Sequence, residues 1–143
     1  MPELLCDLKS VKSSPGTAVV SLRGSIDPRN LATLHAALQA ANGRGFRTLV
    51  FDLGEIRYIN SAGLAYLVNL SDFLVARGGG LHLANAQPKV KLVFELMGLT
   101  ELFKIYRSVD SALAVVGKER RPAAPILTRP ISRPAPSRTS RRV

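Results

Sequence analysis

The chain of 143 residues contains little of the material from which several protein classes are built. It has one cysteine, no tryptophan and only 6% aromatic residues. A single cysteine excludes an internal disulfide, and we expect Cys6 to serve as a small apolar side chain on the first strand. The scarcity of aromatic residues predicts a core made mainly of Leu, Val, Ile and Ala.

Long apolar runs are also absent. No run reaches the roughly 18 residues that a membrane helix needs, which argues against a membrane span. The first residues, Met1 to Asp7, carry two acidic side chains and do not resemble a secretory signal. With the lone cysteine, these absences predict a cytoplasmic protein.

The sequence also lacks the recurrent patterns of enzymes and metal sites. His35 and His82 lie far apart in the sequence, so no cluster of metal ligands is expected. There is no Walker A or G-x-G-x-x-G pattern. Ser61 lacks the glycine two positions earlier that a hydrolase nucleophile elbow requires. We therefore predict no enzymatic activity and no cofactor.

Acidic residues are outnumbered twofold, ten against twenty basic ones. Eight of the basic residues and one acidic residue fall in 118–143, a stretch rich in proline and without hydrophobic periodicity. The composition predicts one domain over 1–117 and a disordered basic tail over 118–143. No aromatic residues alternate with the tail arginines, so we expect no specific nucleic-acid binding. Non-specific attachment to nucleic acid or a membrane surface remains an alternative role for the tail.

Apolar periodicity and turn residues divide the remainder into strands and helices. Strands are expected at 4–11 and 17–23, joined in a hairpin by the turn residues Ser13 to Gly16. Asp27 is predicted to be the N-cap of a first helix and Pro28 its first residue, and the apolar face then continues to Ala41.

The second half of the domain alternates strands with helices. We expect strands at 46–53, 81–85 and 102–106, a helix at 61–77, a helix starting at Pro88 and ending at Gly98, and a last helix capped by Ser108. Two helix faces are predicted to be buried: Leu64, Leu67, Val68, Ser71, Leu74 and Val75 on one helix, and Val90, Val93, Phe94 and Met97 on the next.

This order predicts an α/β fold with a mixed, mainly parallel sheet of four to five strands. An N-terminal antiparallel hairpin forms one edge, and about four helices cover the sheet.

The most informative segment runs from Asp52 to Leu64, where a buried strand leads through a short loop to a serine at a helix start. A serine in that position can cap the helix, because its hydroxyl accepts a bond from a free backbone N–H. It can also carry a phosphate, because the helix N-terminus favours an anion. Both readings of Ser61 stay open on the sequence alone.

Four sequence blocks resemble those of the STAS domain, and specifically the stand-alone bacterial anti-sigma factor antagonists. The blocks follow in order on matching elements: Leu22–Asp27 before the first helix, Leu49–Leu53 in the central strand, Tyr58–Leu64 around the serine, and Pro88–Ile105 around the third helix. The resemblance covers about residues 5–117.

The resemblance implies a STAS-like fold and a switch between partners. An unphosphorylated antagonist of this kind binds an anti-sigma factor, usually a serine kinase with an ATP-binding fold, and so releases a sigma factor. Phosphorylation by the kinase ends the complex, and a serine phosphatase restores the free form. By this resemblance Ser61 is the phosphoacceptor, and the protein is a monomer or weak dimer that regulates transcription.

Two residues depart from the family motif around the serine. Asn60 stands where the family usually has Asp, and Ala62 replaces a second serine. Residues expected to contact the partner are Asp27, Asn60, Ser61, Ala62, Gly63, Tyr66, Asn69 and Phe73, of which the last three lie on one flank of the second helix with Leu70. The alternative function is a constitutive STAS scaffold or a transporter-associated subunit without a phosphorylation switch.

Overall fold

The computed structural model describes residues 4–119, which form one five-stranded sheet and four helices. The elements are β1 (Leu4–Ser10), β2 (Thr17–Ile26), α1 (Leu31–Gly43), β3 (Thr48–Ile59), α2 (Ser61–Ala76), β4 (Gly80–Ala84), α3 (Pro88–Leu96), β5 (Ile105–Tyr106) and α4 (Val109–Glu119). The strands lie in sequence order, β1 antiparallel to β2 and all later pairs parallel. The predicted α/β architecture is confirmed.

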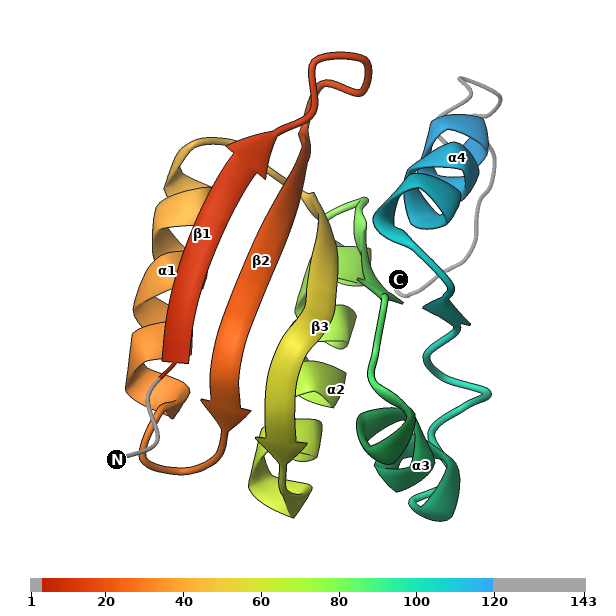
Figure 1. Cartoon of the computed structure of the whole chain (residues 1–143). Coiled ribbons are helices and arrows are strands. Elements are labelled where there is room, and N and C mark those ends of the chain that lie inside the picture. The colour runs from red at the N-terminus through yellow and green to blue at the C-terminus, as the bar shows by residue number, and fades with distance from the viewer. Residues whose placement is uncertain (1–3, 120–143) are drawn as a thin grey trace, which may run out of the picture.

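The helices form two unequal layers. The buried side chains of α1, α2 and α3 share one apolar core with β1–β4. α4 packs on the opposite face, where Ala112 and Val116 form a small cluster with Val50 and Ala84. Figure 1 shows α1 and α2 behind β1–β3, with no helix over the front of β1 and β2. One face of the sheet is therefore only partly covered.

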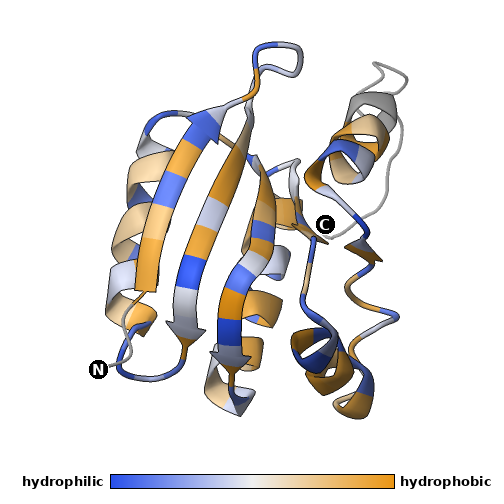
Figure 2. Cartoon of the chain, viewed as in Figure 1, coloured by the Kyte–Doolittle hydropathy of each residue, from blue (hydrophilic) through white to orange (hydrophobic). Residues whose placement is uncertain are grey.

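The two sides of β1 and β2 show why these segments are strands. Burial alternates along the first residues of β1, since Leu4 is buried while Leu5 is half exposed. From Cys6 to Lys9 hydrophobic and hydrophilic residues alternate as well (Figure 2). This alternation suits a strand with one face on the core and one facing water. The hairpin turn is closed by a hydrogen bond of 2.9 Å between the hydroxyls of Ser14 and Thr17.

β3 lies at the centre of the sheet and is longer than predicted. Residues 48–51 are all buried, as expected for a strand covered on both faces. The expected loop after Leu53 is instead a continuation of the strand to Ile59, paired with the second half of β2. The extension escaped prediction because two irregularities in this pairing break the simple alternation of apolar residues.

Several predicted helix faces are shifted. On α2 the buried residues are Gly63, Leu64, Leu67, Leu70 and Leu74, whereas Val75 is 61% exposed. On α3, Val90 and Phe94 are buried, but Met97 lies just past the helix and is 53% exposed. β5 contains two residues rather than five. Val75 and Met97 lie in the last turn or just past the end of their helices, and β5 is an edge strand. Such positions have few neighbours, so periodicity alone places them poorly.

The last helix starts as predicted, since the Ser108 hydroxyl accepts a hydrogen bond of 3.1 Å from the Ser111 N–H. It continues to Glu119, two residues past the domain boundary expected at 117. The predicted disordered tail, from 120 onward, lies outside the described residues. No helix within residues 4–119 is long and apolar enough to cross a membrane.

Candidate functional site

Two loops meet at the carboxyl ends of β2 and β3. The last residues of these strands, Ile26 and Ile59, are paired in the sheet. The next residue after β3, Asn60, donates its backbone N–H to the Ile26 carbonyl at 3.3 Å. The start of α2 is therefore held directly against the start of the β2–α1 loop.

Asn60 is the N-cap of α2. Its backbone is extended, and its side-chain Oδ1 accepts a hydrogen bond of 3.0 Å from the Gly63 N–H. Its carbonyl accepts the first helical bond, from the Leu64 N–H at 2.9 Å. The interpretation of Ser61 as the cap is wrong, because Ser61 already has a helical position and only the residue before it can turn its side chain back.

Ser61 is the first residue of α2 and is exposed. Its hydroxyl makes no hydrogen bond to any residue between 4 and 119. The neighbouring Ala62 is half-buried. The free N–H groups and the dipole of a helix N-terminus favour negative charge at such a position. The geometry leaves this hydroxyl open to a reacting group from outside.

Gly63 allows the close approach of α2 to β2. A Cβ atom at this position would lie 2.7 Å from the Ile26 carbonyl oxygen and 2.8 Å from the Ile26 Cγ2 atom. Both distances are shorter than ordinary contacts. The glycine is therefore required for packing, and it is buried rather than available to a partner.

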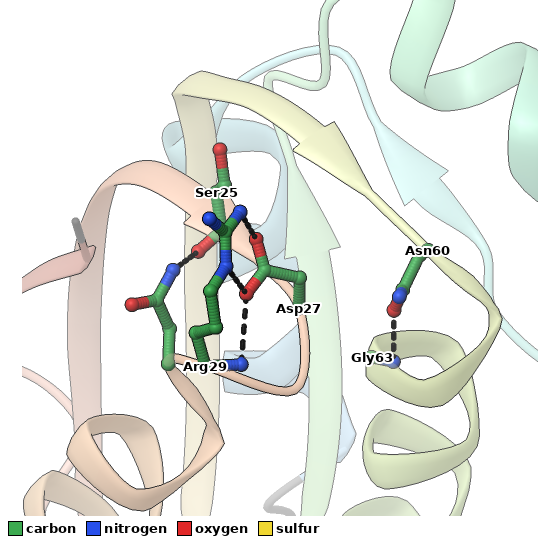
Figure 3. A network of polar contacts seen from close by, with 6 residues as sticks. Ser25, Asp27, Arg29, Asn60 and Gly63 are labelled. Atoms are coloured by element: carbon green, nitrogen blue, oxygen red, sulfur yellow. Dashed lines mark hydrogen bonds and ion pairs between the residues drawn. The ribbon is translucent and has the colours of Figure 1, made fainter. Parts of the chain in front are cut away.

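Asp27 and Arg29 form an ion pair in the β2–α1 loop (Figure 3). The Asp27 side chain is 4% exposed, and its carboxylate accepts hydrogen bonds from the Arg29 backbone N–H at 2.9 Å and from Arg29 Nη2 at 3.0 Å. The hydrogen bond from the Arg29 side chain holds the pKa of the Asp27 carboxyl below its ordinary value. The carboxylate is thus ionised and occupied by Arg29.

The prediction that Asp27 caps α1 is wrong. The residue before α1 is Asn30, whose side chain makes no cap bond and donates instead to the Ser25 carbonyl at 2.9 Å. Residues 27–30 form a turn in which the Asn30 N–H donates to the Asp27 carbonyl at 2.9 Å. The helix begins later because the Asp27 carboxylate accepts the hydrogen bond from the Arg29 backbone N–H and so stabilises the turn. Aspartate side chains often bond in this way to the backbone two residues further on.

The predicted flank of α2 lies beside α1. Tyr66, Asn69 and Phe73 line an apolar cavity of about 250 Å³ between the two helices. Tyr66 is half-buried, and its hydroxyl lies 3.1 Å from His35 Nδ1 on α1. Burial raises the pKa of the Tyr66 phenol. Phe73 is 47% exposed, with the Arg77 guanidinium over its ring.

The structure therefore divides the predicted site residues into two groups. Asp27, Asn60, Ser61, Ala62 and Gly63 lie together at the carboxyl ends of β2 and β3. Tyr66, Asn69 and Phe73 lie further along α2, on the side that faces α1. Leu70, which was predicted to lie on the same flank, is buried.

Arg29 was missed by sequence reasoning. The signal that was available is its place two residues after Asp27, across the turn-forming Pro28.

Comparison with known proteins places this geometry in context. Residues 9–112 match the family model of the STAS domain. The chain is 34% identical over 99 residues to BtrV of Bordetella bronchiseptica, which is provisionally named an anti-sigma factor antagonist. The match covers 69% of this chain and 85% of BtrV.

Solved structures share the fold. An anti-sigma factor antagonist from Mycobacterium paratuberculosis has a TM-score of 0.69 at 26% identity, covering 79% of this chain and 93% of that one. The Bacillus antagonist SpoIIAA is similar in its unphosphorylated form, with a TM-score of 0.64 at 23% identity and coverage of 78% and 96%. Its phosphorylated form has a TM-score of 0.60 at 21% identity, with coverage of 78% and 99%.

Proposed function

The chain belongs to the STAS domain family, as its sequence motifs predict, and from this premise we propose that it is an anti-sigma factor antagonist switched by phosphorylation of Ser61. In the unphosphorylated state it binds an anti-sigma factor that has a serine-kinase, ATP-binding fold. Sequestering that factor frees a sigma factor, so the protein regulates transcription in the bacterial cytoplasm. A serine phosphatase returns the modified protein to its binding state.

The exposed hydroxyl of Ser61 is the observation that carries this proposal. The capping bond of α2 is made by Asn60, so modification of Ser61 removes no hydrogen bond that holds the helix. In the transfer, Ser61 Oγ attacks the γ-phosphorus of ATP, the bond to ADP breaks, and the hydroxyl proton passes to a base on the kinase.

Electrostatics explains why one modification separates the partners without unfolding the domain. Phosphate adds about −1.5 to −2 charge at pH 7. At the exposed first turn of a helix this charge remains hydrated and favours the helix. Inside a docked interface the same charge must lose water or meet like charge, so binding weakens.

The relatives are consistent with this role. BtrV and the mycobacterial protein carry the name anti-sigma factor antagonist, and SpoIIAA with the same fold exists in both phosphorylated and unphosphorylated forms. We extend the role in those names to this chain as part of the proposal.

The test is an affinity capture from the native cytoplasm with the full chain as wild type, Ser61→Ala and Ser61→Asp. We expect wild type and Ser61→Ala to retain one ATP-binding, kinase-like protein that Ser61→Asp loses. Circular dichroism of the three baits serves as the control for folding. Equal retention of the same proteins by all three would contradict the switch. Retention of a transporter by all three would identify the chain as a constitutive subunit.

A further inference from the structure

We propose that the cavity between α1 and α2 is a binding site for a small amphipathic anion, a molecule with an apolar body and one carboxylate. Side chains of both helices form its walls, and Arg44 and Arg77 follow the two helices at one end. Ser61 lies at the other end of α2, so this site is separate from the proposed site of phosphorylation.

The body of the cavity is apolar. Its wall includes the buried side chains of Leu38, Leu70 and Leu74, and no acidic residue between 4 and 119 lines it. Its volume is about 250 Å³. An apolar cavity of about 150 Å³ holds one benzene molecule, so this larger volume suits an apolar body of about eight to ten carbon atoms.

The polar side chains at the end nearer Ser61 are bonded to one another. The Tyr66 hydroxyl lies 3.1 Å from His35 Nδ1, and Gln39 Nε2 lies 3.0 Å from His35 Nε2. An apolar chain can lie against these groups without breaking a hydrogen bond between them, so it leaves no polar group unsatisfied.

Two arginines lie at the opposite end of the cavity. The Arg44 Cζ atom is 5.2 Å from the centre of the Phe46 ring, and the Arg77 Cζ atom is 5.3 Å from the centre of the Phe73 ring. Both rings line the cavity. Neither guanidinium is paired with a carboxylate within residues 4–119. The stacking therefore holds two cations, without an acidic partner, over aromatic walls of an apolar space.

The two arginines lie at the same end because α1 and α2 run in the same direction (Figure 1). The segments that follow these helices meet, since the Gly80 N–H donates to the Arg47 carbonyl at 3.1 Å. Asp72, next to Phe73 in the sequence, is exposed and does not line the cavity. The C-termini of two helices carry together about one negative charge, which two guanidiniums exceed. This end of the cavity is thus net positive and complementary to a carboxylate.

A ligand in this cavity affects the surface predicted to bind the partner. Tyr66, Asn69 and Phe73 are predicted partner contacts, and all three line the cavity. A bound amphiphile covers these side chains and competes with the anti-sigma factor. This consequence rests on the proposed function, whereas binding of the anion does not.

The test is a titration of the full chain with octanoate, followed by NMR of the ¹⁵N-labelled protein. We expect saturable binding with a Kd on the order of 0.1–1 mM for a ligand of about ten non-hydrogen atoms. The shifts of backbone N–H signals should be confined to α1, α2 and the residues that directly follow them. Because 1-octanol has the same apolar body but no charge, it loses two exposed ion pairs and should bind about fivefold more weakly.

The charge-removing variant is Arg44→Gln/Arg77→Gln. It should weaken octanoate binding about fivefold and leave the binding of 1-octanol unchanged. The matched control is Arg57→Gln/Arg107→Gln, which removes the same charge from exposed positions that do not line the cavity.

A second pair of variants tests the apolar wall. Phe73→Ala removes part of the wall and should weaken the binding of both ligands. Val75→Ala shortens an exposed side chain of the same helix outside the cavity and should weaken neither.

Several outcomes would overturn the proposal: equal affinities for octanoate and 1-octanol, equal effects of the two double arginine variants, or shifts away from the cavity. Shifts that depend on protein concentration before octanoate is added would also overturn it, because a second copy of the chain then covers the cavity. If Arg44→Gln/Arg77→Gln does not fold, the comparison of octanoate with 1-octanol on wild type still decides. Neither a partner nor a phosphate takes part, so this test and the test of the proposed function fail separately.

Discussion

Replacing Gly63 by alanine tests the contact on which the site is built. The added methyl group would lie 2.7 Å from the Ile26 carbonyl oxygen, 2.8 Å from Ile26 Cγ2 and 3.1 Å from Ile59 Cγ1. Carbon and oxygen atoms that are not bonded normally stay about 3.3–3.6 Å apart. The first turn of α2 must therefore move away from β2 by roughly half an ångström, since a backbone carbonyl in a sheet cannot rotate away.

The size of the effect follows from two opposing terms. Overpacking a well-filled site costs about 1–3 kcal/mol. Alanine recovers about 0.5–1 kcal/mol of helix propensity relative to glycine. The net loss of unfolding free energy is about 1 kcal/mol, which lowers the Tm of a domain of this size by about 4–5 °C. The displaced turn also carries Ser61, so we expect weaker partner binding by Gly63→Ala.

Gly43→Ala is the matched control, because the chemical change is identical. Gly43 is the last residue of α1, and a Cβ there would have nothing within 4 Å. This variant should gain about 0.5 kcal/mol, or a Tm about 2 °C higher. Thermal unfolding followed by circular dichroism measures both. If Gly63→Ala melts at the same temperature as Gly43→Ala, α2 does not pack against β2 as described.

Three further predictions separate the roles of the remaining site residues. Asn60→Ala should lower the free energy of unfolding by about 1 kcal/mol because the cap is lost, whereas Ser61→Ala should change it by less than about 0.5 kcal/mol. Urea unfolding measures both, and equal losses of stability would show that Ser61 shares the cap. The lowered pKa of Asp27 means that its contribution to stability is present above about pH 4 and lost as pH falls through the folded-state pKa. Acid titration of wild type should therefore show a steeper loss of stability than Asp27→Asn, and parallel curves would refute the ion pair. Tyr66→Ala should lower the Tm because it empties a half-buried site and removes the hydrogen bond to His35 on α1, whereas Phe73→Ala should leave the Tm nearly unchanged. A larger drop in Tm for Phe73→Ala than for Tyr66→Ala would contradict the placement of α2 against α1.

Much of the fold was readable from local pattern. The hairpin turn at 13–16, the apolar run at 48–51 and the Ser108 cap each lie within a few residues, and each was predicted correctly. Errors fell where a distant segment decides the outcome. β3 continues to Ile59 because the end of β2 pairs with it, and Leu70 is buried because α2 packs on the core.

The sequence alone determined the order of the elements, the family motifs and the presence of a serine at the start of α2. These depend on short-range properties: turn residues, apolar spacing and the identity of neighbours along the chain. Only the tertiary structure decided that Asn60 caps α2 and leaves Ser61 free, that Gly63 must lack a side chain, and that Asp27 is committed to Arg29. The requirement at Gly63 depends on how α2 meets the end of β2, and that meeting exists only once the strands have paired. The contacts of Asn60 and Asp27 lie within one short segment each, but which residue caps a helix depends on where the backbone becomes helical, and several neighbouring residues could serve.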